Sequence, residues 1–132
     1  MSVLALADRP VTEQIAAIER GLPASTLRQI VDALGLSQKA IIEALGFAPR
    51  TVALRASRRQ PFSSSESERL LQLIRLRKTA RHVFASDDAV AEWLIAPDPA
   101  LDGRAPLAML STDLGASKVD HLLKAMIHGV PL

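Results

Sequence analysis

The sequence SQKAIIEALGFAPRTVALRASRR, which occupies residues 37–59, carries the clearest structural signal in the chain. Ser37 is a good helix N-cap, and the apolar residues that follow it recur at helical spacing. Gly46 ends this first helix, and Pro49 stands where a second helix begins, because its fixed φ suits a first helical position. Two short helices joined by a tight turn that contains glycine predict a helix-turn-helix, a motif whose second helix enters the major groove of DNA.

One face of the second helix is suited to a DNA groove. At 100° per residue, Val52 and Ala56 lie close together and are expected to face the core. The opposite face offers guanidinium groups for guanine edges or phosphates and a leucine for a thymine methyl. The predicted DNA-binding residues are Arg50, Thr51, Leu54, Ser57, Arg58 and Gln38, with Arg55 and Arg59 in phosphate or structural roles. The simpler alternative is an ordinary helical hairpin with a solvated basic edge.

Length and composition limit what the chain can be. Its 132 residues, 48% of them hydrophobic, are enough for one packed domain or for two very small domains that share a core. It has no cysteine, which excludes disulfides, a thiol nucleophile and a cysteine metal site. No apolar run is long enough to span a bilayer and no secretory signal pattern is present, so we expect a cytoplasmic protein that does not contact membranes.

The sequence lacks the motifs of common enzyme classes. It contains no phosphate-binding loop, nucleophile elbow, metalloprotease helix or calcium loop. His121 and His128 fall on one predicted helix with Lys124 between them, but no carboxylate pair or nucleophile accompanies them at a useful spacing. We therefore predict a protein that is not an enzyme and that has no cofactor or metal site.

Charge is divided unevenly along the chain. Residues 1–82 carry thirteen Lys and Arg against seven Asp and Glu, whereas residues 83–132 carry three against seven. This asymmetry predicts that the two halves meet different partners. The basic half suits phosphates, and the acidic half needs another explanation.

Helical spacing continues on both sides of the helix-turn-helix, and the alternation typical of strands is missing. We expect poor order over residues 1–10 and then a helix over 12–20 that buries Val11, Ile15 and Ile18. Further helices are predicted from Ser25 to Gly35, over 63–84, over 87–94, and from a Ser117 cap to Gly129. The predicted organisation is a helix-turn-helix region over 1–62, a connecting helix and candidate dimer interface over 63–84, and a third region over 85–132.

The third region follows the order of a known family. Its pattern is W-L, then P, L-x-G-x-x-P-L, T-x-x-G-x-x-x-V and H-G-V, made by Phe84, Ala89, Trp93, Leu94, Pro97, Leu101, Gly103, Pro106, Leu107, Leu110, Thr112, Gly115, Val119, Leu123, Ile127 and Gly129. This string resembles the toxin-binding domain of Xre/MbcA/ParS-type antitoxins. The upstream segments ALGFAPRTV and SSSESERLLQL resemble that family's Xre-like helix-turn-helix, so the resemblance covers about residues 20–132.

The resemblance implies a bacterial type II antitoxin with an all-α fold. An Xre-like helix-turn-helix domain would be joined by a long helix to a small helical toxin-binding domain. The latter would neutralise a RES-domain toxin, a class that uses NAD, by covering its active site. The helix-turn-helix would bind operator DNA and repress the protein's own operon, and members of the family are typically dimeric.

The resemblance also implies which residues contact the toxin. The C-terminal end of such antitoxins lies near the mouth of the toxin's active site. The implied toxin contacts are Lys124, Met126, His128, Gly129, Val130, Pro131 and Leu132. Trp93 is either a core residue or a binding anchor. The alternative function is a dimeric helix-turn-helix transcription regulator that has no toxin partner.

Overall fold

The structure is a computed structural model that describes residues 2–129, and over that range it consists of helices and loops. This confirms the all-α fold, with a helix-turn-helix region followed by a long helix and a small helical domain. The elements are η1 (Val3–Asp8), α1 (Val11–Arg20), α2 (Thr26–Leu34), α3 (Gln38–Leu45), α4 (Pro49–Arg58), α5 (Ser64–Ala80), α6 (Asp87–Ile95), η2 (Pro99–Leu101), η3 (Pro106–Met109) and α7 (Asp113–His128), where η marks a 3₁₀ helix.

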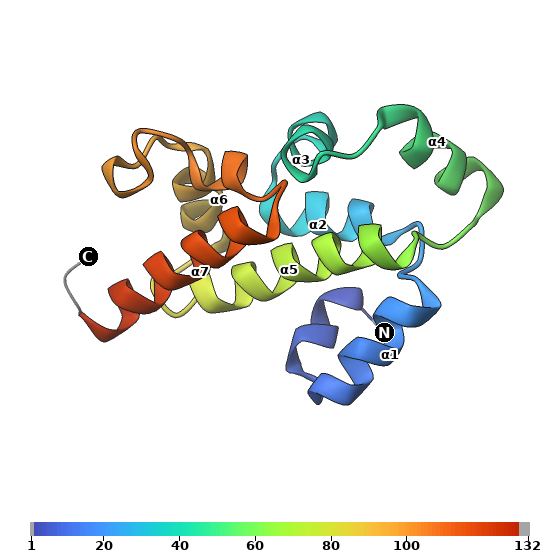
Figure 1. Ribbon diagram of the computed structural model, residues 1–132, viewed down its shortest axis with the longest axis horizontal. Helices are drawn as coiled ribbons and strands as arrows, with labels where there is room; N and C mark the ends of the chain where they lie inside the picture. Colours follow the sequence, from blue (N-terminus) through green and yellow to red (C-terminus); the bar gives the residue numbers. More distant parts are fainter. Residues whose placement is uncertain (1, 130–132) are drawn as a thin grey trace.

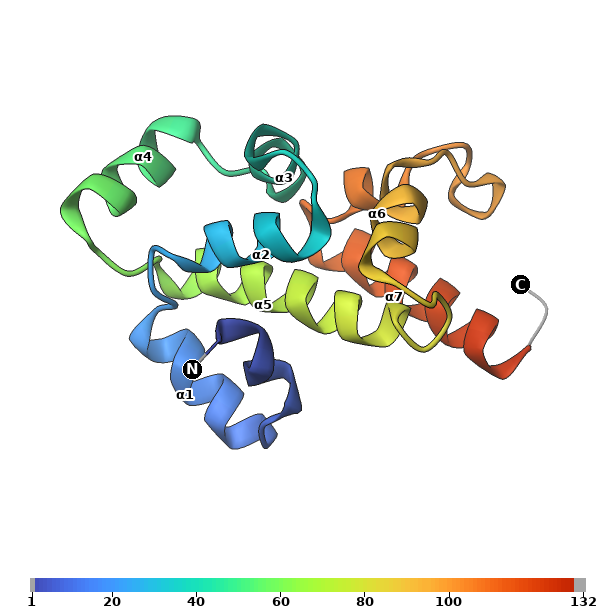
Figure 2. The ribbon, with the colours of Figure 1, turned by 180° about the vertical axis from the view of Figure 1, so that it is seen from behind.

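Helix α5 is the axis of the fold. Figures 1 and 2 show α2 along one side of α5, η1 and α1 on the opposite side, and α7 beside its second half. The buried residues of α5 therefore lie on more than one side of the helix and include Leu70, Leu71, Leu73, Ile74 and Leu76. Because elements of the same chain cover these side chains, a dimer interface on α5 would have to use its polar positions.

Both ends of α5 are set by local contacts. Ser63 accepts a hydrogen bond from the Glu66 N–H at 3.1 Å and donates its own N–H to Glu66 Oε1 at 2.7 Å, which forms a capping box. The helix ends at Ala80, four residues before the predicted end, because the chain turns there. The Phe84 N–H then donates to the Ala80 carbonyl at 2.8 Å.

The start of the chain is ordered, contrary to prediction. Residues 3–8 form η1, and the side chains of Val3, Leu4 and Leu6 pack partly buried against the core. The Val3 N–H donates to Gln29 of α2 at 2.8 Å, and Lys78 of α5 lies 2.9 Å from Asp8. These long-range partners stabilise a segment whose own sequence carries no strong helix signal.

The face that helix α1 turns to the core matches the predicted one only in part. Ile18 packs partly buried against the core, but Val11 and Ile15 are 62% and 48% exposed, whereas Gln14 and Ala17 are buried. The side-chain amide of Gln14 donates to the Arg9 carbonyl at 2.9 Å, so that it satisfies the turn between η1 and α1. The hydrophobic pattern gave the wrong buried face because the turn after η1 needs a hydrogen-bond donor from α1. Gln14 supplies that donor and therefore lies on the buried side.

Helix α7 begins earlier than predicted. Its N-cap is Thr112, which accepts a hydrogen bond from the Gly115 N–H at 3.0 Å, and Ser117 lies inside the helix. Gly115 lies in the first turn of the helix. A Cβ at this position would lie 1.9 Å from the Met109 carbonyl oxygen, so a larger residue would clash. The close approach of η3 to α7 therefore requires glycine at this position.

No helix within residues 2–129 combines the length and apolar character that crossing a bilayer requires.

Candidate functional site

The turn between α3 and α4 is held by local and long-range contacts. Ser37 caps α3 by accepting a hydrogen bond from the Ala40 N–H at 3.1 Å, and Gly46 ends it with a left-handed φ of 72°. Arg69 of α5 donates to the Leu45 carbonyl at 2.7 Å, which fastens the end of α3 to the central helix. The helix-turn-helix is thus attached to the axis of the fold through its first helix.

Helix α4 lies at the edge of the molecule in both ribbon views (Figures 1 and 2). Just before it, the ring of Phe47 stacks on Phe62, with ring centroids 6.1 Å apart. Val52 is the only residue of α4 that is buried. Ala56 was expected to face the core and is exposed instead, because a groove of about 820 Å³ separates it from the start of α2.

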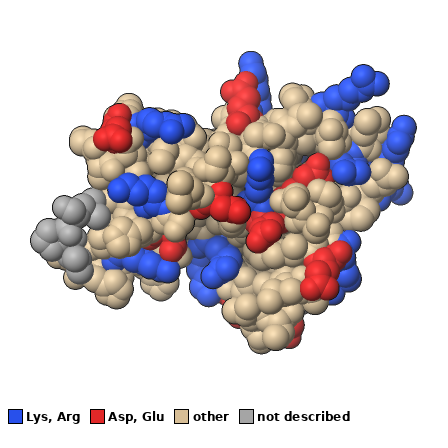
Figure 3. All heavy atoms as spheres, viewed as in Figure 1, with Lys and Arg blue, Asp and Glu red and all other residues tan. Residues whose placement is uncertain are grey.

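The outward face of α4 carries the main set of predicted DNA contacts. Arg50, Ser57 and Arg58 are exposed, Leu54 is 39% exposed, and Thr51 is half-buried. Figure 3 shows Lys and Arg side chains projecting from the end of the molecule that carries α4, at the upper right of the view. The structure therefore brings five of the predicted residues onto one basic helix that solvent can reach.

The other three predicted DNA-binding residues, Arg55, Arg59 and Gln38, lie away from the outward face of α4. Arg55 turns toward α5, where its Nη2 lies 3.3 Å from Glu66 Oε1. Arg59 ends α4 with a left-handed φ of 52°, a conformation that residues other than glycine rarely adopt. Gln38 is exposed on the rim of the groove between α2 and α4.

An arginine–aspartate pair joins α5 to the C-terminal domain. Arg77 donates to both carboxylate oxygens of Asp87, with Nε–Oδ1 and Nη2–Oδ2 distances of 2.9 Å. Hydrogen bonding from Arg77, aided by its charge and that of Arg81, holds the pKa of Asp87 below its usual range. Asp87 is the first residue of α6, so the pair fixes where α6 starts relative to the end of α5.

Trp93 lies in the packing between α6 and the turn that follows α5. Its ring is half-buried, and its centroid is 5.5 Å from that of Phe84. The neighbouring Leu94 is fully buried. The structure thus places the Trp93 ring partly in the core, with part of it left at the surface.

The end of α7 is exposed. It projects beyond the body of the molecule in both ribbon views (Figures 1 and 2). Met126 and Ile127 are 40% and 39% exposed, His128 is exposed, and Gly129 ends the helix with a φ of 65°. Lys124 is exposed and pairs with Asp120 at 2.8 Å. The other predicted toxin contacts, Val130, Pro131 and Leu132, lie outside the described residues.

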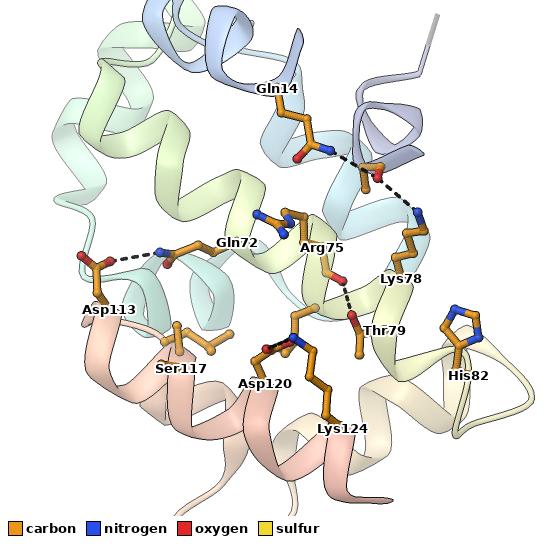
Figure 4. Close-up of a pocket in the computed structure, with 14 residues that line it drawn as sticks. Gln14, Gln72, Arg75, Lys78, Thr79, His82, Asp113, Ser117, Asp120 and Lys124 are labelled. Carbon is orange, nitrogen blue, oxygen red and sulfur yellow. Dashed lines mark hydrogen bonds and ion pairs between the residues drawn. The ribbon is translucent and has the colours of Figure 1, made fainter. Parts of the chain in front are cut away.

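A polar groove of about 460 Å³ runs between α5, α7 and the N-terminal segment (Figure 4). Its side chains are largely engaged with one another, since Gln72 donates to Asp113 at 3.0 Å and Asp120 is paired with Lys124. No group of three His, Asp or Glu side chains within residues 2–129 is placed to hold a metal ion. We therefore interpret the groove as the boundary where the N-terminal segment, α5 and α7 pack together, and not as a binding site.

Sequence reasoning missed Leu114, which is 84% exposed and stands beside a hollow of about 630 Å³. No local pattern marks it, since the buried Ala125 of the same helix lies only about 20° from Leu114 on a helical wheel. The exposure of Leu114 follows from the packing of its neighbours.

The chain matches two protein-family models that together take in both halves. Residues 13–75 match the antitoxin Xre-like helix-turn-helix domain, and residues 79–129 match the antitoxin Xre/MbcA/ParS C-terminal toxin-binding domain. These two domains define a non-enzymatic antitoxin of a toxin–antitoxin system. The chain belongs to the Xre/MbcA/ParS antitoxin family. This assignment favours the antitoxin over a transcription regulator without a toxin partner.

Individual relatives agree with the family. A protein named Prs ADP-ribosylating antitoxin from Sphingobium sp. is 31% identical over 126 residues, which span 89% of this chain and 79% of the relative. An antitoxin Xre from Yersinia enterocolitica is 29% identical and is matched over 85% of this chain and 87% of its own length. A chain in the crystal structure of the M. tuberculosis MbcT–MbcA toxin–antitoxin complex superposes with a TM-score of 0.63 at 25% identity, covering 83% of this chain and 96% of that one.

Proposed function

We propose that this antitoxin neutralises a RES-type toxin that consumes NAD, by covering the toxin's active site with the end of α7. The observation that carries the proposal is the exposure of this end. Met126 and Ile127 present apolar surface at the tip of a projecting helix, next to the exposed His128. Exposed apolar side chains gathered at a protruding terminus are suited to insertion into a partner's cleft.

The relatives support the choice of toxin. The Sphingobium relative is named for ADP-ribosylation of Prs, and NAD is the usual donor of the ADP-ribose group. A toxin of this kind has a cleft that accepts a large dinucleotide, and we propose that the projecting end of α7 occupies it. Transfer of this chemistry to the present chain rests on family membership.

The net negative charge of residues 83–132 is only weak support for binding to a phosphate-binding cleft. Asp87 and Asp120 are paired with Arg77 and Lys124, and the tip of α7 carries His128 rather than acids. Contact at the tip is therefore expected to depend on shape and apolar surface, and not on attraction of a negative helix to a phosphate-binding cleft.

We also propose that the protein binds operator DNA through α4 and represses its own operon as a homodimer. Support comes from the exposed Arg50, Ser57 and Arg58 and from the match to an Xre-like helix-turn-helix. A dimer would place two copies of α4 on successive half-sites of an operator, about one helical turn apart. Sedimentation analysis of the purified protein, alone and with operator DNA, tests the dimer.

Removal of residues 129–132 tests the proposed inhibition. The full chain and the shortened chain are each expressed with the toxin from the adjacent gene, and growth, co-purification and NAD consumption are measured. We expect the full chain to restore growth and suppress NAD consumption, and the shortened chain to do so poorly while still binding the promoter. Equal protection by the two chains would remove the tail from the inhibitory contact.

A further inference from the structure

Leu114 is exposed at the start of α7, in a turn whose backbone is held by its neighbours. Thr112 caps the helix, Asp113 accepts a hydrogen bond from Gln72 of α5, and Gly115 is buried against the Met109 carbonyl. These contacts fix the first turn of the helix on its inner side. Leu114 points away from all of them and is 84% exposed, more than any other large hydrophobic residue among 2–129. The order of this turn means that the backbone at Leu114 loses little freedom when a partner covers the side chain.

The surface beside Leu114 combines apolar and cationic side chains. A hollow of about 630 Å³ has a lining that is apolar, polar and cationic in turn, made by Met109, Leu114, Gly115, Thr112, Ser117, Arg104, Lys118 and His121. Arg104 is held there because its Nη2 donates to the Ala108 carbonyl at 3.2 Å. Apolar side chains beside arginine and other polar groups are common in protein–protein contacts.

This surface lies on the same side of α7 as His128, at the proposed inhibitory end of the helix. Leu114, Lys118, His121 and His128 are exposed and lie within about 80° of one another on the helix. The buried Ala125 falls within this arc, and the exposed Met126 and Ile127 lie outside it. The face that they form extends over 14 residues, or about 21 Å, and finishes at Gly129. A partner can therefore contact the hollow and His128 from one side, while Met126 and Ile127 meet other parts of that partner. All of these residues fall within the matched toxin-binding domain.

The local charge of the face differs from that of the domain. Residues 83–132 contain only three Lys or Arg, and two of them, Arg104 and Lys118, border the hollow. The ion pairs formed among residues 2–129 do not include either side chain, whereas the third, Lys124, is paired with Asp120. A partner that covers this face must therefore supply carboxylates around an apolar contact.

We propose that the face formed by Leu114, Met109, Arg104, Lys118 and His121 is a second anchor for the toxin, separate from the tip of α7. This inference rests on the proposed toxin-neutralising function. Leu114 enters an apolar depression on the toxin, and acidic side chains around that depression face Arg104 and Lys118. The anchor holds the toxin while the end of α7 covers its active site.

Titration calorimetry with full-length antitoxin and the purified toxin from the adjacent gene tests the anchor. We expect Leu114→Ser to weaken affinity about 30-fold, the loss typical of a hot-spot residue, and Lys118→Glu to weaken it by about tenfold or more. Val11→Ser is the matched control, because Val11 is 62% exposed on α1 and lies outside the toxin-binding domain. Its affinity should stay within about twofold of the unsubstituted protein.

The outcomes separate the anchor from the proposed function. Affinity of Leu114→Ser and Lys118→Glu equal to that of Val11→Ser would overturn the anchor while leaving toxin binding in place. Absence of binding by the unsubstituted protein would overturn the proposed function itself. If Leu114→Ser abolished self-association in sedimentation and left toxin affinity unchanged, the face would belong to a second copy of this chain, and the anchor would be wrong. Thermal unfolding of each variant shows that the fold is retained.

Discussion

Arg55 of α4 and Glu66 of α5 approach within 3.3 Å of each other across the loop that separates the two helices. The same Glu66 carboxylate accepts the Ser63 N–H at 2.7 Å and so closes the capping box of α5. One side chain thus starts the central helix and also ties down α4, which buries only Val52 in the core. The orientation of the proposed DNA-binding helix α4 therefore depends on the contact between Arg55 and Glu66, which lies on the inner side of α4, away from the proposed DNA-binding face.

Glu66→Ala removes both interactions and is expected to lower the free energy of unfolding by about 1–2 kcal/mol. It should also weaken promoter binding, because α4 is less firmly placed. Glu68→Ala is the control, since Glu68 is exposed and lies outside the capping box. Urea unfolding and a gel-shift titration make the comparison, and equal stability of the two variants would contradict the dual role of Glu66.

Gly115→Ala is expected to destabilise the protein by about 1–3 kcal/mol, the cost typical of overpacking. Its added Cβ would meet the Met109 carbonyl oxygen at 1.9 Å and force η3 away from α7. In an uncrowded helix the same change is stabilising by roughly 1 kcal/mol. The sign of the change in stability therefore shows whether η3 crowds position 115. Thermal unfolding measures it, and a raised melting temperature would show that η3 does not approach so closely.

The Arg77–Asp87 pair predicts a loss of stability in acid. Because the folded pKa of Asp87 is lowered from its ordinary 3.8, the pair contributes fully above that value. Its contribution declines as the pH falls from 3.8 through the folded pKa. Asp87→Asn should cost about 1 kcal/mol at pH 7, and the difference from the unsubstituted protein should shrink in acid. Urea unfolding over a pH series tests this, and a constant difference would argue against the pair.

Arg50→Ala and Arg58→Ala are each expected to weaken promoter binding by about tenfold and to leave toxin affinity unchanged. If the lost contacts are to phosphates, the slope of log affinity against log salt should decrease by about one for each arginine. Arg75→Ala serves as the control, because Arg75 is exposed on α5 in the groove beside α7. Equal binding by all three variants would remove α4 from the DNA interface.

Helix ends were predictable where the signal is local. Ser37, Gly46 and Gly129 each act on backbone groups a few residues away, and each acts in the structure as its residue type predicts. The long helix was found for the same reason, although its cap proved to be a reciprocal box with Glu66. The start of α7 was misplaced because two capping sequences, at Thr112 and Ser117, competed and the position of η3 selected the first.

The burial of side chains was less predictable. Val11 and Ile15 form an apolar stripe in sequence, yet they are exposed because Gln14 faces the turn after η1. Ala56 repeats with Val52 at helical spacing, yet a groove lies beneath it. Leu114 received no notice, because its exposure is apparent only once the contacts of its neighbours are known.

The amino-acid sequence sufficed for the all-α class, the helix-turn-helix, most helix ends and the family, because these depend on patterns spanning a few residues or on the order of motifs along the chain. Tertiary structure decided which faces of α1, α4 and α7 meet solvent, how residues 3–8 are ordered, and where charges are neutralised. Those properties depend on contacts between segments far apart in sequence, such as Gln72 with Asp113. Periodicity within a single helix shows that it has an apolar side, whereas its packing partners determine which side is covered.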